Sequence, residues 1–137
     1  ANVVGVRQTH GVIVDFVKKL KNDKTSLEIL GDGRQEKSYI HVSDCMGAVL
    51  HAVSKSKERI NLFNIGSGDT ITVDEIAGIV ALEMGLAPRF AHTGGSIGWP
   101  GDIALSRLSI EKLKASGWSP KYSSLQAVKK SVRELLE

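Results

Sequence analysis

The sequence has 137 residues, of which 42% are hydrophobic, 24% charged and 5% aromatic, and this composition predicts one folded domain rather than a disordered chain. Its apolar runs fall far short of the ~20 residues that cross a membrane. Its single cysteine, Cys45, excludes a disulfide framework and favours a cytoplasmic location. The formal net charge is +3, but the basic residues stand beside acidic ones with no aromatic residues between them, so we expect neither a membrane nor a nucleic-acid partner.

The first third of the chain predicts alternating strands and helices. Residues 1–6 form an apolar run typical of a buried strand. Such a strand needs neighbours on both sides, so we expect the chain to be part of a longer polypeptide. Apolar residues at helical spacing predict a helix from Val12 to Leu20, and residues 27–30 predict a short strand before the turn at residues 31–33. Residues 37–42 predict an extended segment.

The next predicted helix begins after this extended segment. Ser43 has the side chain of an N-cap, and Asp44 follows it in the first turn. The helix is expected to bury a stripe of apolar residues at helical spacing, namely Met46, Val49, Leu50 and Val53. Residues 60–65 predict a further strand, which ends at a Gly-Ser-Gly turn.

Two capping boxes mark helices in the second half of the chain. Thr72 with Glu75 opens a helix that Gly85 ends, and a strand is expected at residues 89–93. A loop follows from Gly94 to Gly101. The predicted core residues of this helix are Ile76, Ile79, Val80 and Met84.

The last two helices complete the pattern. Ser109 is the expected cap of a short helix that Gly117 stops. Ser123 and Gln126 form the second capping box, and the final helix has its apolar stripe at Leu125, Val128, Val132 and Leu135. The alternation of strands and helices predicts an α/β fold with parallel strand pairs and no second domain.

Few residues carry a recognisable reaction chemistry. The run from Gly95 to Gly101 matches the glycine spacing of a dinucleotide cradle, but no helix is expected directly after it and Trp99 would obstruct the close approach of a pyrophosphate. No His or Cys pair has zinc-ligand spacing. Cys45 is interpreted as a buried thiol, and Ser67 as a turn residue rather than a nucleophile.

Polar residues at the ends of the apolar strands are the remaining candidates for a ligand site. Ligands of open α/β folds gather at strand ends, where basic groups meet phosphates and acids accept sugar hydroxyls. Surface residues would show the same spacing, so this pattern leaves both interpretations open. The residues concerned are Asn2, Arg7, Lys37, Asp44, Asp102 and Arg107.

Five segments, taken in order, share the pattern of one family. They are Ala1-Asn2-Val3-Val4-Gly5-Val6-Arg7, the run Gly31-Asp32-Gly33-Arg34-Gln35-Glu36-Lys37-Ser38-Tyr39-Ile40-His41-Val42-Ser43-Asp44, Phe63-Asn64-Ile65-Gly66-Ser67-Gly68, Gly101-Asp102 and Gly117-Trp118-Ser119-Pro120. Together they resemble the carboxyl-terminal portion of the NAD-dependent sugar epimerase/dehydratase family, the extended short-chain dehydrogenases typified by UDP-glucose 4-epimerase. The resemblance spans essentially the whole chain.

The resemblance implies a fold for this chain and places NAD binding and catalysis in another part of the protein. Residues 1–137 would comprise the last strands of a Rossmann sheet and a small mixed α/β substrate-binding lobe, as a single domain. NAD and the family's Tyr-x-x-x-Lys pair would belong to an amino-terminal Rossmann half of the same protein. Neither tyrosine in this chain is followed four residues later by lysine, because Ser43 stands four residues after Tyr39 and Gln126 four residues after Tyr122. No catalytic or cofactor-binding residue is therefore expected in this chain.

Substrate contacts carry over by position. Asn2 would contact the sugar or diphosphate of a nucleotide-sugar substrate, and Gly11 and Val12 would flank the nucleotide. Lys37 falls where many members have an arginine that holds the diphosphate or ribose, and Asp102 would accept a ribose hydroxyl.

Two departures from the family pattern affect the charge of the site. Trp99 replaces the usual diphosphate-binding arginine and could stack on a base or sugar, although packing between lobes is an equal alternative. Lys37 supplies a positive charge but cannot form the two parallel hydrogen bonds that a guanidinium makes to a phosphate. The site would therefore lack this geometry unless Arg7, Arg34 or Arg107 takes the place of the missing arginines.

The expected function is therefore that of a lobe which positions a UDP-sugar, or another nucleotide-sugar, over NAD held by the absent half. A homodimer is expected, because the first strand lacks neighbours and presents apolar surface. Two alternatives remain open: a parent enzyme that dehydrates or decarboxylates its substrate, and a free-standing, non-catalytic module that binds sugar nucleotides.

Overall fold

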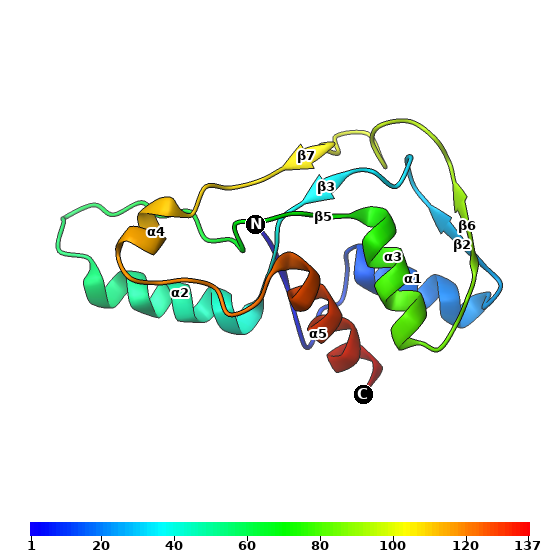
Figure 1. Cartoon of the computed structure of the whole chain (residues 1–137), viewed down its shortest axis with the longest axis horizontal. Helices are drawn as coiled ribbons and strands as arrows, with labels where there is room; N and C mark the ends of the chain where they lie inside the picture. The colour runs from blue at the N-terminus through cyan, green and yellow to red at the C-terminus, as the bar shows by residue number, and fades with distance from the viewer.

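The computed structural model describes residues 1–137 as a mixed α/β arrangement (Figure 1). The elements follow in the order β1 (Asn2–Val4), α1 (Val12–Asn22), β2 (Ser26–Ile29), β3 (Glu36–Lys37), β4 (Tyr39–His41), α2 (Val42–Lys55), β5 (Ile71–Thr72), α3 (Val73–Glu83), β6 (Arg89–His92), β7 (Leu105–Ser106), α4 (Glu111–Ala115) and α5 (Ser124–Leu136). None of these helices is both long and apolar enough to cross a bilayer.

Three small sheets hold the strands together. β1 pairs with β4 and β2 pairs with β6, both in parallel. β3 lies between β5, which is antiparallel to it, and β7, which is parallel. The predicted α/β class with parallel pairing is therefore confirmed.

The hydrophobic core lies where α1, α3 and α5 pack against one another and against β2 and β4 (Figure 1). Each helix turns one apolar stripe inward, as its 3.6-residue periodicity predicts. Burying each aliphatic side chain of this size contributes roughly 1.5–3 kcal/mol. The innermost of them are Ile13, Leu20, Leu27, Ile29, Ile76, Val80, Val128 and Val132.

Both predicted capping boxes are confirmed. Thr72 accepts a hydrogen bond from the backbone N–H of Glu75 at the start of α3, and Ser123 accepts one from Gln126 at the start of α5. Gly85 follows α3 in the left-handed region, with φ of 67°, which glycine adopts without steric cost. The helix starts that depend on local side-chain chemistry were therefore predictable.

The start and the buried face of α2 were predicted wrongly. The helix begins at Val42, and its N-cap is His41, whose side chain accepts a hydrogen bond from the backbone N–H of Ser43. The four residues expected to form its core stripe are exposed, and only Asp44 and Ala48 are buried. The exposed fractions are 52% for Met46, 37% for Val49, 67% for Leu50 and 73% for Val53. Helical spacing identifies an apolar face but not what covers it.

Other expectations also need correction. Residues 60–65 form no strand, because no neighbouring segment pairs with them, and Ile60 and Leu62 are exposed. The N-cap of α4 is Ile110 rather than Ser109. The buried face of α5 includes Ala127 and Ser131, whereas Leu125 is 46% exposed.

The two predicted extended segments are shorter than expected. The segment at residues 37–42 divides into β3 and β4. The opening strand is confined to Asn2–Val4 and is only partly buried, since Val3 and Val6 are exposed.

Candidate functional site

A cavity of about 290 Å³ lies where the start of α1, the end of β2, strands β3 and β4 and the loop before β7 meet. Val73 at the start of α3 completes its wall, so parts of the chain that are far apart in sequence form one site. Its lining residues are Gly11, Val12, Asp15, Phe16, Leu30, Gln35, Lys37, Tyr39, Val73, Gly98, Trp99 and Asp102.

The start of α1 forms one wall of the cavity. Gly11 is the N-cap residue, with φ of 95° and no side chain to cap the helix, and Val12 begins the first turn. The first backbone N–H groups of a helix have no intrahelical partner, and the helix dipole makes this end attractive to anions. This wall can therefore receive a phosphate or another polar acceptor.

A second wall comes from β3 and β4, where alternate residues face the cavity. Gln35, Lys37 and Tyr39 all line it, as the two-residue period of an extended chain dictates. Tyr39 is buried, and this burial, with a smaller effect of the nearby Asp102 charge, raises the pKa of its phenol to about 12. Tyr39 therefore remains a neutral hydrogen-bonding group at physiological pH.

The charged groups of the cavity are largely paired with one another. The ammonium of Lys37 donates to the carboxylate of Asp102, which also accepts from the backbone N–H groups of Gly98 and Ile103. Burial raises the pKa of Asp102, but these hydrogen bonds outweigh it and hold the pKa below its usual value. Asp102 is thus an ionised acceptor, held in place by three donors.

The aromatic wall comes from Trp99. Trp99 is 57% exposed, so its indole ring forms a surface platform and is not part of the core. A Cβ at Gly101, whose φ is 92°, would lie 3.2 Å from the indole ring, and glycine at this position therefore lets the loop fold closely against it. An exposed aromatic face beside a cavity can stack on a planar ligand group.

Asn2 lies outside this cavity, in an adjoining hollow of about 210 Å³. Its side-chain amide donates to the carbonyl of Ser38 at 3.1 Å, and the hollow shares Lys37, Trp99 and Asp102 with the cavity. The structure therefore brings together five of the six predicted site residues and places the sixth beside them.

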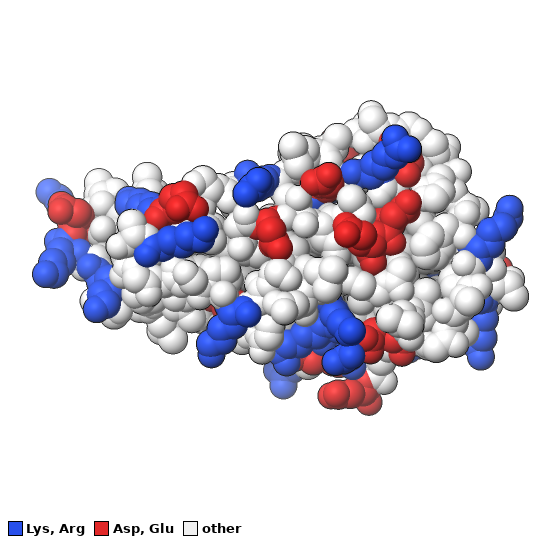
Figure 2. Space-filling model, in the orientation of Figure 1, with Lys and Arg blue, Asp and Glu red and all other residues white.

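No arginine substitutes for the guanidinium groups that the family pattern leads one to expect. Arg107 donates to the carbonyl of Gly68, while Arg7 and Arg34 do not line the cavity. The charged groups of the cavity wall are Lys37, Asp15 and Asp102, so the wall carries no excess of positive charge. Over the surface, basic and acidic side chains are mixed on the face shown in Figure 2.

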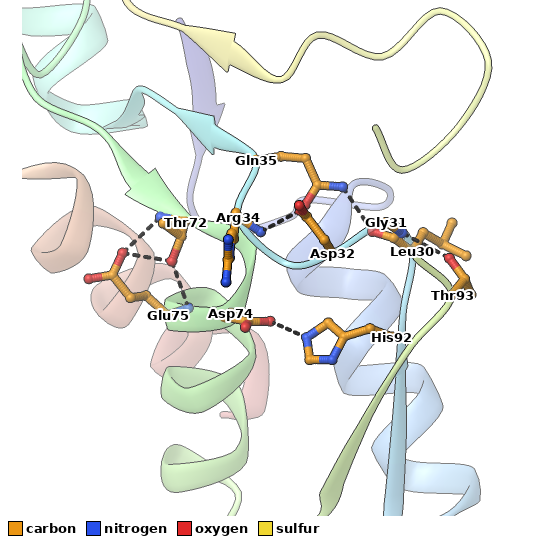
Figure 3. A network of polar contacts seen from close by, with 10 residues as sticks. All are labelled: Leu30, Gly31, Asp32, Arg34, Gln35, Thr72, Asp74, Glu75, His92 and Thr93. Carbon is orange, nitrogen blue, oxygen red and sulfur yellow. Dashed lines mark hydrogen bonds and ion pairs between the residues drawn. The ribbon is translucent and has the colours of Figure 1, made fainter. Parts of the chain in front are cut away.

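Sequence reasoning missed several lining residues. Gln35 and Tyr39 could have been found from their alternation with Lys37. Leu30 and Gly98 gave no such signal, because their position depends on how the end of β2 meets a distant loop. Figure 3 shows the Gln35 amide directed at the carbonyl of Leu30, where they form a hydrogen bond of 3.0 Å.

The residues of this chain do not form a dinucleotide cradle. A pyrophosphate-binding glycine loop needs a helix N-terminus directly after it. Residues 95–101 are instead followed by extended chain and β7. The interpretation of this glycine spacing as a chance match agrees with the structure.

Comparisons with known proteins agree on one family. The sequence model of the NAD dependent epimerase/dehydratase family matches residues 1–66. A Methanocaldococcus jannaschii protein bearing the name UDP-glucose 4-epimerase is 29% identical over 136 residues, which cover 96% of this chain and 42% of that protein.

Solved structures show the same relationship. The crystal structure of a UDP-galactose 4-epimerase superposes with a TM-score of 0.87 at 38% identity, over 99% of this chain and 43% of the other. The UDP-glucose 4-epimerase of Thermotoga maritima, crystallised with UDP-glucose, gives a TM-score of 0.81 at 30% identity, over 100% of this chain and 45% of the other. The chain thus spans less than half the length of these relatives, and it belongs to the NAD-dependent epimerase/dehydratase family of nucleotide-sugar enzymes.

Proposed function

We propose that residues 1–137 are the substrate-binding domain of an NAD-dependent nucleotide-sugar epimerase of the UDP-glucose 4-epimerase type. The domain holds the nucleotide diphosphate, so that the sugar is placed against NAD bound by an amino-terminal Rossmann half. The base that removes the proton and the hydride acceptor belong to that half. Binding energy in this domain then contributes to catalysis by positioning the sugar.

The observation that carries the proposal is the cavity at the start of α1. It gathers residues of three kinds that a nucleotide requires: helix-terminal N–H groups at Gly11 and Val12, a fixed carboxylate at Asp102 and an aromatic platform at Trp99. Carboxylates bind ribose hydroxyls by accepting their hydrogens, and phosphates are attracted to helix N-termini. The relative crystallised with UDP-glucose supports uridine diphosphate as the nucleotide.

The apolar face of α2 supports the proposed partner. In Figure 1, α2 projects away from the body formed by α1, α3 and α5. Its exposed side chains Leu50 and Val53, with Val3 and Val6 around β1, leave an apolar surface of the kind that marks an interface. We propose that this surface packs against the Rossmann half in a cytoplasmic enzyme that forms homodimers.

A non-catalytic module that binds sugar nucleotides by itself is the competing function. The two proposals differ in affinity, because a severed half of a site retains only part of the contacts. Calorimetric titration of the chain with UDP-glucose at micromolar concentrations should show no saturable heat if our proposal is correct. A micromolar Kd would favour the independent module.

If this chain holds only half of the substrate site, its weak binding of UDP-glucose can still be mapped onto individual residues. Titrating millimolar UDP-glucose into ¹⁵N-labelled chain should shift amide resonances at Gly11, Val12 and Gly98, and W99A should weaken this binding several-fold. The exposed L82K variant on α3 is the control and should bind as the unmodified chain does. Shifts spread over other surfaces would contradict the proposed site.

The chain should also lack epimerase activity. It has no Tyr-x-x-x-Lys pair and no dinucleotide cradle, so incubation with NAD and UDP-glucose should give neither NADH absorbance nor UDP-galactose. Turnover by the purified chain would overturn the proposal.

A further inference from the structure

Three serine hydroxyls form a hydrogen-bonded line outside the cavity. The hydroxyl oxygen of Ser67 lies 2.8 Å from that of Ser38 and 2.8 Å from that of Ser124. Ser38 is 2% exposed and Ser124 is 0% exposed. Ser38 stands between β3 and β4, Ser67 lies in the turn before β5, and Ser124 begins α5. Ser67 therefore joins three segments that are distant in sequence, although it does not itself line the cavity.

The direction of the hydrogen bond from Ser38 follows from its surroundings. A serine hydroxyl has one hydrogen to donate, and a carbonyl oxygen can only accept. The carbonyl of Asp69 lies 3.3 Å from the hydroxyl of Ser67 and 3.2 Å from that of Ser124, so both can donate to it. The hydroxyl of Ser38 has Ser67 as its one partner. Every hydrogen is used when Ser38 donates to Ser67, which is thus the acceptor for a buried donor that has no other.

Ser38 is the point at which the chain beside the cavity passes from one sheet to another. Its backbone N–H donates to the carbonyl of Ser106 on β7 at 3.0 Å, and its carbonyl accepts from the backbone N–H of Asn2 on β1 at 3.0 Å. Its neighbours Lys37 and Tyr39 both line the cavity. Alternate residues of an extended chain point to opposite sides, so the hydroxyl of Ser38 anchors, from behind, the backbone from which both cavity residues project.

The other end of the line holds the same segment. The hydroxyl of Ser124 accepts from the backbone N–H of Tyr39 at 3.0 Å. The turn that carries Ser67 packs closely on this junction, since a Cβ on Gly66 would lie 3.4 Å from the hydroxyl oxygen of Ser38. Ser38 by its side chain and Tyr39 by its backbone are therefore tied to two hydroxyls that both meet Ser67.

We propose that Ser67 is a positioning residue of the substrate cavity, whose hydroxyl acts through Ser38 to set the directions of Lys37 and Tyr39. The part of the inference that concerns substrate rests on the proposed function, in which the ligand is a nucleotide sugar. Binding groups have to be held within about 0.5 Å of their working positions by neighbours that are themselves fixed. The effect on Lys37 can be measured without substrate, because its ammonium donates to the carboxylate of Asp102.

The test uses S67A, S67C and a matched control in the full chain. S67A leaves the hydroxyl of Ser38 without an acceptor, whereas S67C keeps a side chain of similar size whose thiol bonds only weakly. The control is S116A, because the hydroxyl of Ser116 also has two partners, the carbonyl of Leu113 at 2.6 Å and the ring of His51 at 3.0 Å. Neither Ser116 nor these partners line the cavity. Spectral dispersion reports whether each variant is folded, and urea denaturation reports its stability.

The first measurement is the pKa of the Asp102 carboxyl in the ligand-free chain, by carbon-detected NMR titration. Burial raises this pKa, and the hydrogen bond from Lys37 is the largest of the effects that lower it. If S67A displaces Lys37, the pKa of Asp102 should rise, in the direction in which K37M raises it. S67C should give a smaller rise in the same direction, and S116A should give none.

The second measurement is the affinity for UDP-glucose, from amide shifts at millimolar concentrations. S67A should lower it about fivefold, which corresponds to the net contribution of one hydrogen bond. S67C should lower it by less, and S116A should bind as the unmodified chain does.

A change in stability alone would overturn the inference. If S67A lowered the midpoint of urea unfolding but left the pKa of Asp102 and the affinity unchanged, Ser67 would only support its turn. Loss of spectral dispersion in both Ser67 variants would make the hydroxyl a requirement of folding and would overturn the inference too. If the unmodified chain showed no cavity shifts with UDP-glucose, the proposed function would fail, and the role of Ser67 in binding with it, whereas a pKa shift in S67A would still show that Ser67 positions Lys37.

Discussion

Lys37 and Asp102 form the ion pair on which the geometry of the cavity depends. Their side chains are 21% and 7% exposed, so neither charge is fully hydrated. A partly buried charge that loses its partner is destabilising, because its desolvation is no longer compensated. The pair therefore stabilises the loop around Gly98 as well as presenting a carboxylate to a ligand.

Removing the cation should destabilise the fold. We expect K37M to lower the free energy of unfolding by about 2 kcal/mol, because the Asp102 carboxylate would remain buried with backbone donors alone. Urea denaturation measures this change. The control is K19M, since the pair that Lys19 forms with Asp15 is more exposed and should contribute less than about 1 kcal/mol. Equal losses in the two variants would contradict the role assigned to Lys37.

The same pair predicts a pH dependence. The pKa of Asp102 is lowered in the folded state, so its contribution to stability is present above the unfolded pKa of about 4 and is lost as the pH falls below that value. In K37M the pKa of Asp102 should rise towards its unfolded value, and the loss of stability at low pH should therefore become smaller. Carbon-detected NMR titration of the carboxyl group checks both statements; an unchanged pKa in K37M would contradict them.

At the scale of elements, α3 links the core to the cavity. Its capping box at Thr72 fixes the position at which β5 ends and the helix begins, and Val73 in the first turn lines the cavity. Asp74 in the same turn accepts from the imidazole of His92 at 2.8 Å, which joins α3 to the end of β6 (Figure 3). One helix start thus connects two sheets with the site.

Loss of this cap should be measurable. T72A removes the acceptor for the Glu75 N–H and should lower the free energy of unfolding by about 1 kcal/mol. The exposed T9A variant is the control, because the Thr9 hydroxyl makes one exposed hydrogen bond, to the neighbouring His10 ring at 3.4 Å, and we expect no measurable change. Thermal unfolding followed by circular dichroism compares the two, and equal midpoints would contradict the capping role.

At the scale of the whole molecule, the apolar face of α2 is the most conspicuous surface. Contiguous apolar patches are uncommon on isolated monomers and mark interfaces or sites of association. Here the patch runs along one helix that packs only lightly on the rest of the chain, with Ala48 as its one buried apolar residue. The chain by itself should therefore associate through this face.

Charge on this face should suppress the association. The double variant L50K/V53K places ammonium groups at positions that are 67% and 73% exposed, so it should lower the apparent mass at high protein concentration without lowering stability. Light scattering measures the mass and urea denaturation the stability. L82K, at a 70% exposed position on α3, controls for added charge and should have no effect; a clean monomer before substitution would contradict the prediction.

The sequence by itself determined the alternation of elements, the caps of α3 and α5, and five of the twelve residues that line the cavity. Each depends on local physics: a side-chain oxygen three residues before a free N–H, a repeat of two or 3.6 residues, or a run of motifs in a known order. Only the tertiary structure decided which faces are covered. It exposed the stripe on α2, left residues 60–65 unpaired and buried Gln35 beside Leu30, because burial depends on which distant segments arrive at a surface, and no local pattern specifies that.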